Sequence, residues 1–211
     1  MAELHLSVLP APQRRLWEEL SAVPDSFVLY GDTAIALQLG HRQSVDFDFF
    51  ARTDFDPTQL IEQVAFLNDC EPLQVERNTL TVRVQRQGPV LMSFFGMPRL
   101  PLLRQPNILE HPRLRLGHLL ELGGMKAMVV QKRAEAKDYL DIHALITQGG
   151  LSLPELLAAG IALYQPSYAP EITLKSLCFF DDGNLGNVPQ AVRRDLARAV
   201  RACDPTRLPQ L

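Results

Sequence analysis

Residues Ser44 to Phe50 alternate strictly between polar and apolar side chains, and this alternation constrains the fold more than any other feature of the sequence. An extended chain places its apolar members on one face and Asp46 and Asp48 on the other. A helix, with about 3.6 residues per turn, cannot sort the same residues in this way. We therefore predict a β-strand with one face in a core and two carboxylates on the opposite face.

The residues around this strand predict further short elements. Phe27 to Tyr30 is an apolar run that ends at Gly31, which is typical of a buried strand. Thr33 to Leu39 is rich in Ala and Leu and is followed by Gly40, so we expect a helix with a glycine stop. Asp56-Pro57 has the order of a helix cap followed by a proline in the first position, and predicts another helix.

The rest of the chain changes from β patterning to helical patterning. Residues 72–95 alternate around a Gln87-Gly88 turn signal and predict a hairpin, and the proline-rich stretch 97–113 predicts a loop or a lobe boundary. We expect an α+β protein, with an α/β lobe over residues 1–110 that contains a mixed sheet and a helical lobe over residues 111–211. The predicted helices cover residues 12–22, 118–134, 138–148, 153–163 and 189–203.

Composition excludes several classes of protein. The chain has 211 residues, 46% of them hydrophobic, and a net charge of −3, which excludes a strongly basic nucleic-acid binder but not a local basic patch. No apolar run approaches the length of about 20 residues that spans a bilayer, and the N-terminus lacks the pattern of a secretory signal. Cys70, Cys178 and Cys203 are too few and too scattered for a disulfide framework or a zinc site. A soluble cytoplasmic protein without a membrane partner is the expectation.

Two segments of the first half carry residues suited to phosphate chemistry. Asp46 and Asp48 project from one strand face, roughly 7 Å apart along the chain, and paired carboxylates suit Mg²⁺ bound together with substrate phosphates. Gly31 ends a strand where a helix begins at once, and the N–H groups of a helix start can hold a phosphate. Together these parts suit metal-assisted nucleotidyl transfer. The alternative is that the two carboxylates belong only to the solvated face of a half-buried strand.

Positively charged residues offer further candidates. On a continuous helix, Lys126, Arg133 and Lys137 would share a face that can meet a triphosphate or an RNA backbone, although a solvated basic stripe has the same spacing. Asp138 can equally cap a new helix, which would break that face. Arg42 precedes the carboxylate strand and can neutralise its charges, position a phosphate or form a surface ion pair.

The amino-acid sequences of these segments resemble those of a known family. VLYGDTAIALQLGHRQSVDFDFF is similar to the first motif of the AbiEii-type nucleotidyltransferase family, whose members include toxins of toxin–antitoxin systems. Lys126 to Asp141 resembles the second block of that family, in which a Lys, an Arg and a (Lys/Arg)-Asp-x-x-Asp unit recur. LKSLCFFDD, residues 174–182, resembles a late segment of one bacterial subgroup.

The resemblance implies a nucleotidyltransferase fold, a helical second lobe, a nucleoside triphosphate substrate and Mg²⁺ or Mn²⁺ as cofactor. It implies RNA as an acceptor class and an antitoxin protein as a partner. By position, Asp46 and Asp48 would bind the metal, and the catalytic residues would be these two with Lys126, which contacts the nucleotide, and Asp138. The predicted nucleotide-binding residues are Gly31, Thr33, Arg42 and Arg133.

Two residues depart from the family pattern. Asp32 stands where the family commonly has Gly or Ser, and as a helix cap it would compete with phosphate for the same N–H groups. Ser93 stands where many nucleotidyltransferases carry a third carboxylate, and a hydroxyl is the poorer Mg²⁺ ligand. The alternative hypothesis is therefore a catalytically degenerate member that binds a nucleotide or a protein partner.

Overall fold

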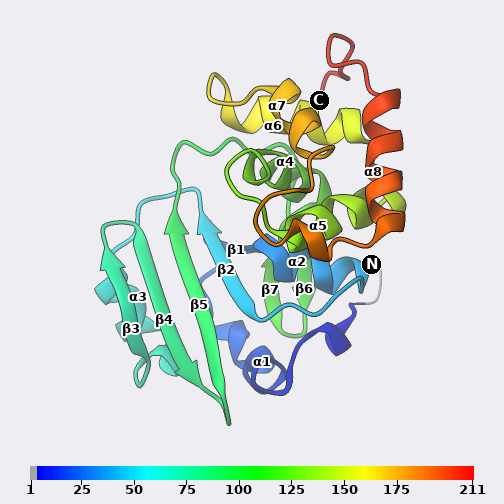
Figure 1. The fold of residues 1–211 in the computed structure, drawn as a ribbon. Helices are drawn as coiled ribbons and strands as arrows, with labels where there is room; N and C mark the ends of the chain where they lie inside the picture. The colour runs from blue at the N-terminus through cyan, green and yellow to red at the C-terminus, as the bar shows by residue number, and fades with distance from the viewer. Residues whose placement is uncertain (1–3) are drawn as a thin grey trace. The chain divides into compact units, whose positions relative to one another are not determined.

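The computed structural model describes residues 4–211, which form two compact units (Figure 1). The first unit comprises the described residues up to Leu100 together with Gln105–Gly117, and the second comprises Pro101–Arg104 and His118–Leu211. The strands of residues 4–211 all lie in the first unit, and the second unit is helical. The predicted α+β class, a mixed sheet followed by helices, is confirmed.

One mixed sheet of seven strands forms the first unit, in the order β3-β4-β5-β2-β1-β7-β6. β2 lies at its centre, parallel to β5 and antiparallel to β1. Both edges of β2 are therefore bonded, which fixes the register of its side chains against both neighbours. The strands are β1 (Phe27–Tyr30), β2 (Asp46–Ala51), β3 (Glu71–Glu76), β4 (Thr79–Gln85), β5 (Pro89–Gly96), β6 (Asn107–Glu110) and β7 (Arg113–Leu116).

From Asp46, where the strand begins, the alternation sorts the side chains of β2 as expected. The prediction was wrong for the two residues before it, because Ser44 is buried and Val45 is exposed. Phe47 and Phe49 are fully buried, and Asp46 and Asp48 are half-buried on the other face. Phe49 stacks on Phe94 of β5 with 5.1 Å between ring centroids. Because a slip of one residue would move these rings out of the core, the aromatic packing also fixes the face that carries the carboxylates.

Short helices complete the first unit. The helix predicted over residues 12–22 is α-helical as far as Leu16 and continues as a 3-10 helix to Ala22. Asp56 caps α3 as predicted, because its carboxylate accepts from the backbone N–H groups of Thr58 at 2.8 Å and Gln59 at 3.2 Å. The helices are α1 (Ala11–Leu16), α2 (Gly31–Leu39) and α3 (Pro57–Gln63), with 3-10 turns at Leu6–Val8, Trp17–Ala22 and Ala65–Leu67.

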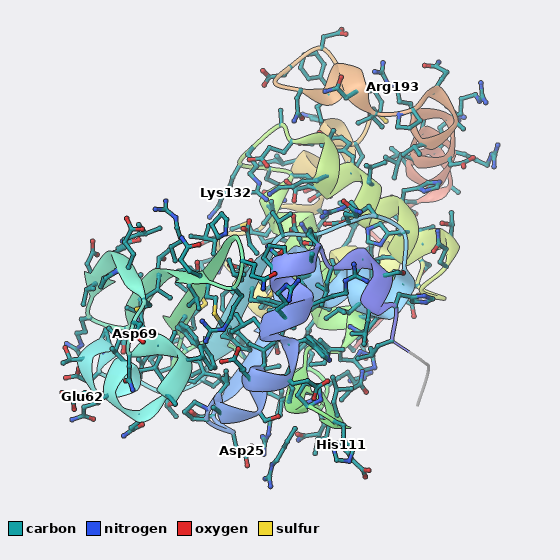
Figure 2. The ribbon with its side chains drawn as sticks, turned by 90° about the horizontal axis from the view of Figure 1, so that it is seen from below. Asp25, Glu62, Asp69, His111, Lys132 and Arg193 are labelled. Atoms are coloured by element: carbon teal, nitrogen blue, oxygen red, sulfur yellow. The ribbon has the colours of Figure 1, made fainter. Side chains whose placement is uncertain are left out.

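The proline-rich stretch 97–113 was predicted as a loop or a lobe boundary. The chain does pass between the two units within it, at Pro101–Arg104, but the stretch is not a continuous loop. It contains β6 and the start of β7, which form a hairpin with His111 at its turn (Figure 2). Leu114 and Leu116 are buried while Arg113 is exposed, so β7 does alternate. The strands are only four residues long and lie between prolines, and this hid the alternation in the sequence.

The second unit is built around the packing of α4 on α6. A Cβ atom on Gly124 of α4 would lie 2.8 Å from the backbone carbon of Ala159 in α6, so glycine permits this close approach. The predicted helix 118–134 ends at Val129, and α7 was not predicted. No helix of the described chain is long and apolar enough to cross a bilayer. The elements are α4 (Leu119–Val129), α5 (Ala136–Thr147), α6 (Leu153–Tyr164), α7 (Pro170–Ser176), a 3-10 turn (Leu185–Asn187) and α8 (Gln190–Ala202).

Candidate active site

The two carboxylates of β2 lie beside a hydroxyl of the neighbouring strand. The parallel register pairs Asp46 with Leu91 and Asp48 with Ser93 of β5. Ser93 is buried and its Oγ lies 3.4 Å from Thr81 Oγ1 of β4. A hydroxyl, and not a third carboxylate, therefore lies beside Asp48 on β5.

Gly31 is the residue that lets the Asp48 carboxylate lie against the start of α2. β1 pairs antiparallel with β2, which sets Tyr30 opposite Asp48, and Gly31 follows at once with a φ of +69°. A Cβ atom on Gly31 would lie 2.6 Å from Asp48 Oδ2. The left-handed backbone and this contact both exclude a side chain, so the carboxylate occupies space that only glycine leaves.

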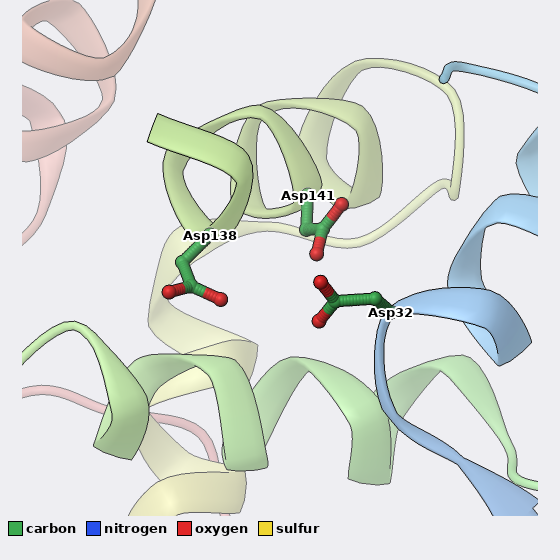
Figure 3. Close-up of side chains that lie close together, drawn as sticks. All are labelled: Asp32, Asp138 and Asp141. Atoms are coloured by element: carbon green, nitrogen blue, oxygen red, sulfur yellow. The ribbon is translucent and has the colours of Figure 1, made fainter. Parts of the chain in front are cut away.

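Asp32 is not the N-cap residue of α2, which corrects the prediction for Asp32. Tyr30 is the N-cap residue and makes no side-chain cap bond. Asp32 lies inside the first turn (Figure 3), and its carboxylate contacts Arg42 Nη2 at 2.9 Å. The reason is position: an N-cap residue precedes the first turn, whereas Asp32 lies inside it and its carboxylate contacts Arg42. Arg42 thus partly neutralises Asp32, and both side chains are mostly buried.

Thr33 joins α2 to the carboxylate strand. Its side chain is buried, and its hydroxyl is hydrogen-bonded to Ser44 Oγ at 2.7 Å and to the carbonyl oxygen of Asp46. Because this hydroxyl is held inside the first unit, only the backbone of Thr33 remains for the predicted phosphate contact. The side chain holds Asp46 and α2 in place.

A cavity of the first unit opens beside Asp46. It has a volume of about 370 Å³ and is lined by Asp46, Leu91, Arg83 and Gln13 among others. The Gln13 side chain is buried and its Nε2 donates to the carbonyl of Val45 at 2.6 Å, which braces the residue next to Asp46. Asp46 therefore has space in front of it within its own unit.

In the second unit, Lys126 is enclosed by two carboxylates of α5. Its Nζ lies 2.6 Å from Asp138 and 2.7 Å from Asp141, and all three side chains are almost entirely buried. Asp138 and Asp141 project from the same side of α5 (Figure 3). Asp141 was not among the predicted site residues, although its spacing of three from Asp138 in the Asp-x-x-Asp unit was the available signal.

Arg133 reaches the same carboxylate because the chain leaves the helix. α4 ends at Val129 and α5 begins at Ala136, so the predicted continuous basic face of Lys126, Arg133 and Lys137 does not exist. The guanidinium binds Asp138 with two of its nitrogens, Nε to Oδ2 at 2.8 Å and Nη2 to Oδ1 at 3.0 Å. Asp138 lies in the first turn of α5 without capping it, because its carboxylate faces these two cations.

Arg133 also lines a cavity of about 180 Å³ inside the second unit. Tyr139, Phe179 and Asp182 form part of its wall, so the segment LKSLCFFDD contributes to it. Burial, together with the negative charges of Asp138 and Asp182, raises the pKa of Tyr139 to about 12. The phenol is therefore neutral at pH 7 and donates to the carbonyl of Ser176 at 3.0 Å.

The mixed sheet, the paired carboxylates of β2 and the helix start after Gly31 define a protein of the nucleotidyltransferase fold. The profile of the family described as nucleotidyl transferase AbiEii toxin, type IV TA system, matches residues 15–210, and the chain belongs to this family. The resemblance found in the sequence is thereby confirmed.

One relative and two solved structures are similar to this chain. An uncharacterised protein of Aquifex aeolicus (strain VF5) is 29% identical over 178 residues, which cover 82% of this chain and 84% of that protein. A crystal structure of a proposed nucleotidyltransferase from H. pylori has a TM-score of 0.56 at 17% identity and covers 90% of each chain. MenT4, a nucleotidyltransferase toxin from Mycobacterium tuberculosis H37Rv, has a TM-score of 0.58 at 17% identity, with 92% of this chain and 83% of that chain covered. At such identities the two structures establish the fold.

Proposed function

We propose that the chain is a metal-dependent nucleotidyltransferase that moves a nucleotide from a nucleoside triphosphate to an acceptor, with RNA as the acceptor class, and that it acts as the toxin of a toxin–antitoxin pair. The observation that carries the proposal is the placement of Asp48, next to Asp46 on β2 and against Gly31 at the start of α2. A carboxylate pair and a helix start in one unit are the parts that metal-assisted phosphoryl chemistry needs.

Asp46 and Asp48 fit a divalent cation. Both offer carboxylate oxygens on one face of β2, and Gly31 leaves the space that Asp48 occupies. Mg²⁺ or Mn²⁺ bound there would neutralise phosphate charge and lower the pKa of an acceptor hydroxyl. The protein's own part is to hold the two side chains in register through β1, β5 and the Thr33 hydroxyl.

The positively charged residues have two proposed roles. In the first unit, Arg42 offsets the charge of Asp32 beside the first turn of α2, whose N–H groups we propose for the triphosphate. In the second unit, Lys126 and Arg133 are proposed to contact the nucleotide. Asp138 is then a positioning residue, because its buried carboxylate holds both cations and favours their charged forms.

One observation favours a second candidate. Ser93 is the residue beside Asp48 on β5, and a hydroxyl holds Mg²⁺ less well than a carboxylate does. A degenerate member of the family would bind a nucleotide, or a protein partner, without transfer.

Incubation of the protein with each α-labelled nucleoside triphosphate, Mg²⁺ and total cellular RNA tests the proposal. We expect label in RNA with the wild type, loss of at least about a hundredfold with Asp48→Asn, and no loss with the control Asp69→Asn, which changes an exposed carboxylate beyond α3 (Figure 2). Expression in cells should arrest growth with the wild type and the control only, and co-expression of the antitoxin should relieve the arrest. Nucleotide binding without any transfer would favour the degenerate member.

A further inference from the structure

Helix α8 divides into a buried side and a side of exposed arginines. Val192 and Leu196 are buried against the second unit. With a turn of about 100° per residue, Arg194, Arg198 and Arg201 fall within about 60° of one another, opposite Leu196. All three side chains are exposed, Arg198 to 74%. We call these three residues the α8 arginine face.

Of the arginine face, only Arg198 forms an ion pair within the chain, with Asp195 at 3.3 Å on the surface of α8. Arg193, the remaining arginine of α8, anchors the helix: it donates to the carbonyls of Leu185, Gly186 and Val188 at 2.8–3.0 Å and lies over the Phe180 ring at 5.0 Å (Figure 2). Within the described residues, Arg194 and Arg201 contact no carboxylate. The arginine face is therefore available to a partner.

The single acidic residue of α8, Asp195, lies at the border of this face and also pairs with α5. Asp195 accepts from His143 Nε2 of α5 at 3.1 Å, and Arg198 touches the same carboxylate at 3.3 Å. The helix thus carries four arginines and one aspartate in a chain whose net charge is −3. Such a local excess of one sign is the electrostatic footprint of a polyanion partner.

An RNA acceptor needs a surface of this kind. The candidate site is built on Asp46 and Asp48, which repel a phosphodiester backbone. Affinity for RNA must then come from cations elsewhere on the protein, because neutralised phosphates release counterions and this release drives binding. Through Phe180, which packs 5.8 Å from Tyr139, the start of α8 is linked to the residue after Asp138.

We propose that the α8 arginine face binds the phosphodiester backbone of the acceptor RNA. This inference rests on the proposed function, since it assumes an RNA acceptor. The three guanidinium groups are spread over about 10 Å of helix, and each can donate two hydrogen bonds to a phosphate.

The composition of the face favours RNA over an acidic protein or a lipid surface. A stable protein interface needs an apolar or aromatic centre, and a membrane-bound helix needs a free apolar side. The apolar side of α8 is occupied by the core. Between the arginines the outward positions hold only small or polar residues, namely Gln190, Ala191, Ala197 and Ala202.

RNA binding by the full chain tests the proposal without catalysis. The probe is a fluorescein-labelled single-stranded RNA of mixed sequence, and the variant is Arg194→Gln, Arg198→Gln and Arg201→Gln together. We expect roughly tenfold or weaker binding near physiological salt, and a slope of log K against log salt that is flatter by about 2, from three contacts at about 0.7 each. The control, Arg14→Gln, Arg15→Gln and Arg77→Gln, removes three exposed arginines of the first unit and should bind as the wild type does.

Further variants and readouts decide between the outcomes. Lysine at the three α8 positions keeps the charge and should lose less affinity than glutamine, which also guards against a folding defect. In transfer assays the glutamine variant should raise KM for RNA and leave kcat and KM for the triphosphate unchanged. Unchanged RNA affinity in the glutamine variant would overturn the proposal, as would an equal loss of affinity for polyglutamate. If the wild type transfers no label to RNA but binds it through the arginine face, the proposed function fails and RNA binding by α8 stands.

Discussion

At the scale of single residues, the candidate site depends on contacts that allow little substitution. Asp48 Oδ2 lies where a Cβ atom of Gly31 would be, and Thr33 uses its hydroxyl to hold Ser44 and the backbone of Asp46. Asp32 and Arg42 pair beside the same helix start. These contacts place two carboxylates and a set of backbone N–H groups in one unit, and each can be tested by a single change.

Gly31→Ala should harm both folding and activity. The change forces a left-handed alanine, at about 1 to 2 kcal/mol, and pushes the new methyl group into Asp48. Gly150→Ala is the matched control, because Gly150 has nearly the same φ, +68° against +69°, and no atom within 4 Å of the new Cβ. Urea unfolding should show the larger loss for Gly31→Ala, and only this variant should lose the stabilisation by Mn²⁺ that the metal site predicts. Equal losses of unfolding free energy in the two variants would mean that the Asp48 side chain can move away from the new methyl group at no energetic cost.

At the scale of elements, α4 and α5 are joined by buried charges. Lys126 comes from α4, and Asp138 and Asp141 come from α5. The loop between the helices turns Arg133 back onto Asp138. Buried carboxylates are tolerated only when cations and hydrogen bonds compensate them, so the two helices depend on each other for stability as well as for the site.

Lys126→Met should therefore lower the free energy of unfolding by about 3 to 5 kcal/mol, because it leaves two buried carboxylates without their shared cation. Adding Asp141→Asn to this variant should restore part of the loss. The control is Lys132→Met, an exposed lysine of the neighbouring loop (Figure 2), with an expected change within about 0.5 kcal/mol. Chemical denaturation measures all three variants. A loss no larger than that of the control would contradict the prediction.

At the scale of the whole molecule, the ionisable groups are unevenly distributed. The arginines of α8 stand out in an acidic chain. Burial raises the pKa of three tyrosines of the second unit, Tyr139, Tyr164 and Tyr168, to about 12 each. The free energy of unfolding of this unit should consequently change with pH in the alkaline range.

The sign of this pH dependence follows from the raised pKa values. An unfolded tyrosine ionises near pH 10, so the buried neutral phenols contribute stability that is complete below about pH 10 and is lost as the pH rises toward 12. Circular dichroism in urea should show lower unfolding midpoints across this range. Tyr164→Phe should make the dependence shallower, by at most about 1.4 kcal/mol per pH unit. Phenolate absorbance that titrates near pH 10 in the folded protein would contradict the prediction.

The sequence by itself determined the elements whose pattern is local. β2 was predictable because period-two alternation reports a half-buried strand wherever the strand pairs. The cap of α3 at Asp56 and the strand-Gly-helix unit at Gly31 could also be predicted, because each depends only on residues that are adjacent in the sequence. The sequence motifs around Asp46, Asp48 and Lys126 were sufficient to predict the family, and the profile match confirms this prediction.

Only the tertiary structure decided which of these residues meet. Asp32 looked like a cap and instead contacts Arg42. Lys126 was expected to share a basic face with Arg133 and Lys137 and instead lies buried against Asp138 and Asp141. The hairpin of β6 and β7 escaped detection because strands of four residues carry too short a pattern. The physical reason is the same for Asp32 and Lys126. Periodicity in the sequence fixes the face of an element on which a side chain lies, but the partner of a charged side chain depends on which distant segments pack against it. Once the charge is buried, it needs that partner to compensate for the lost hydration.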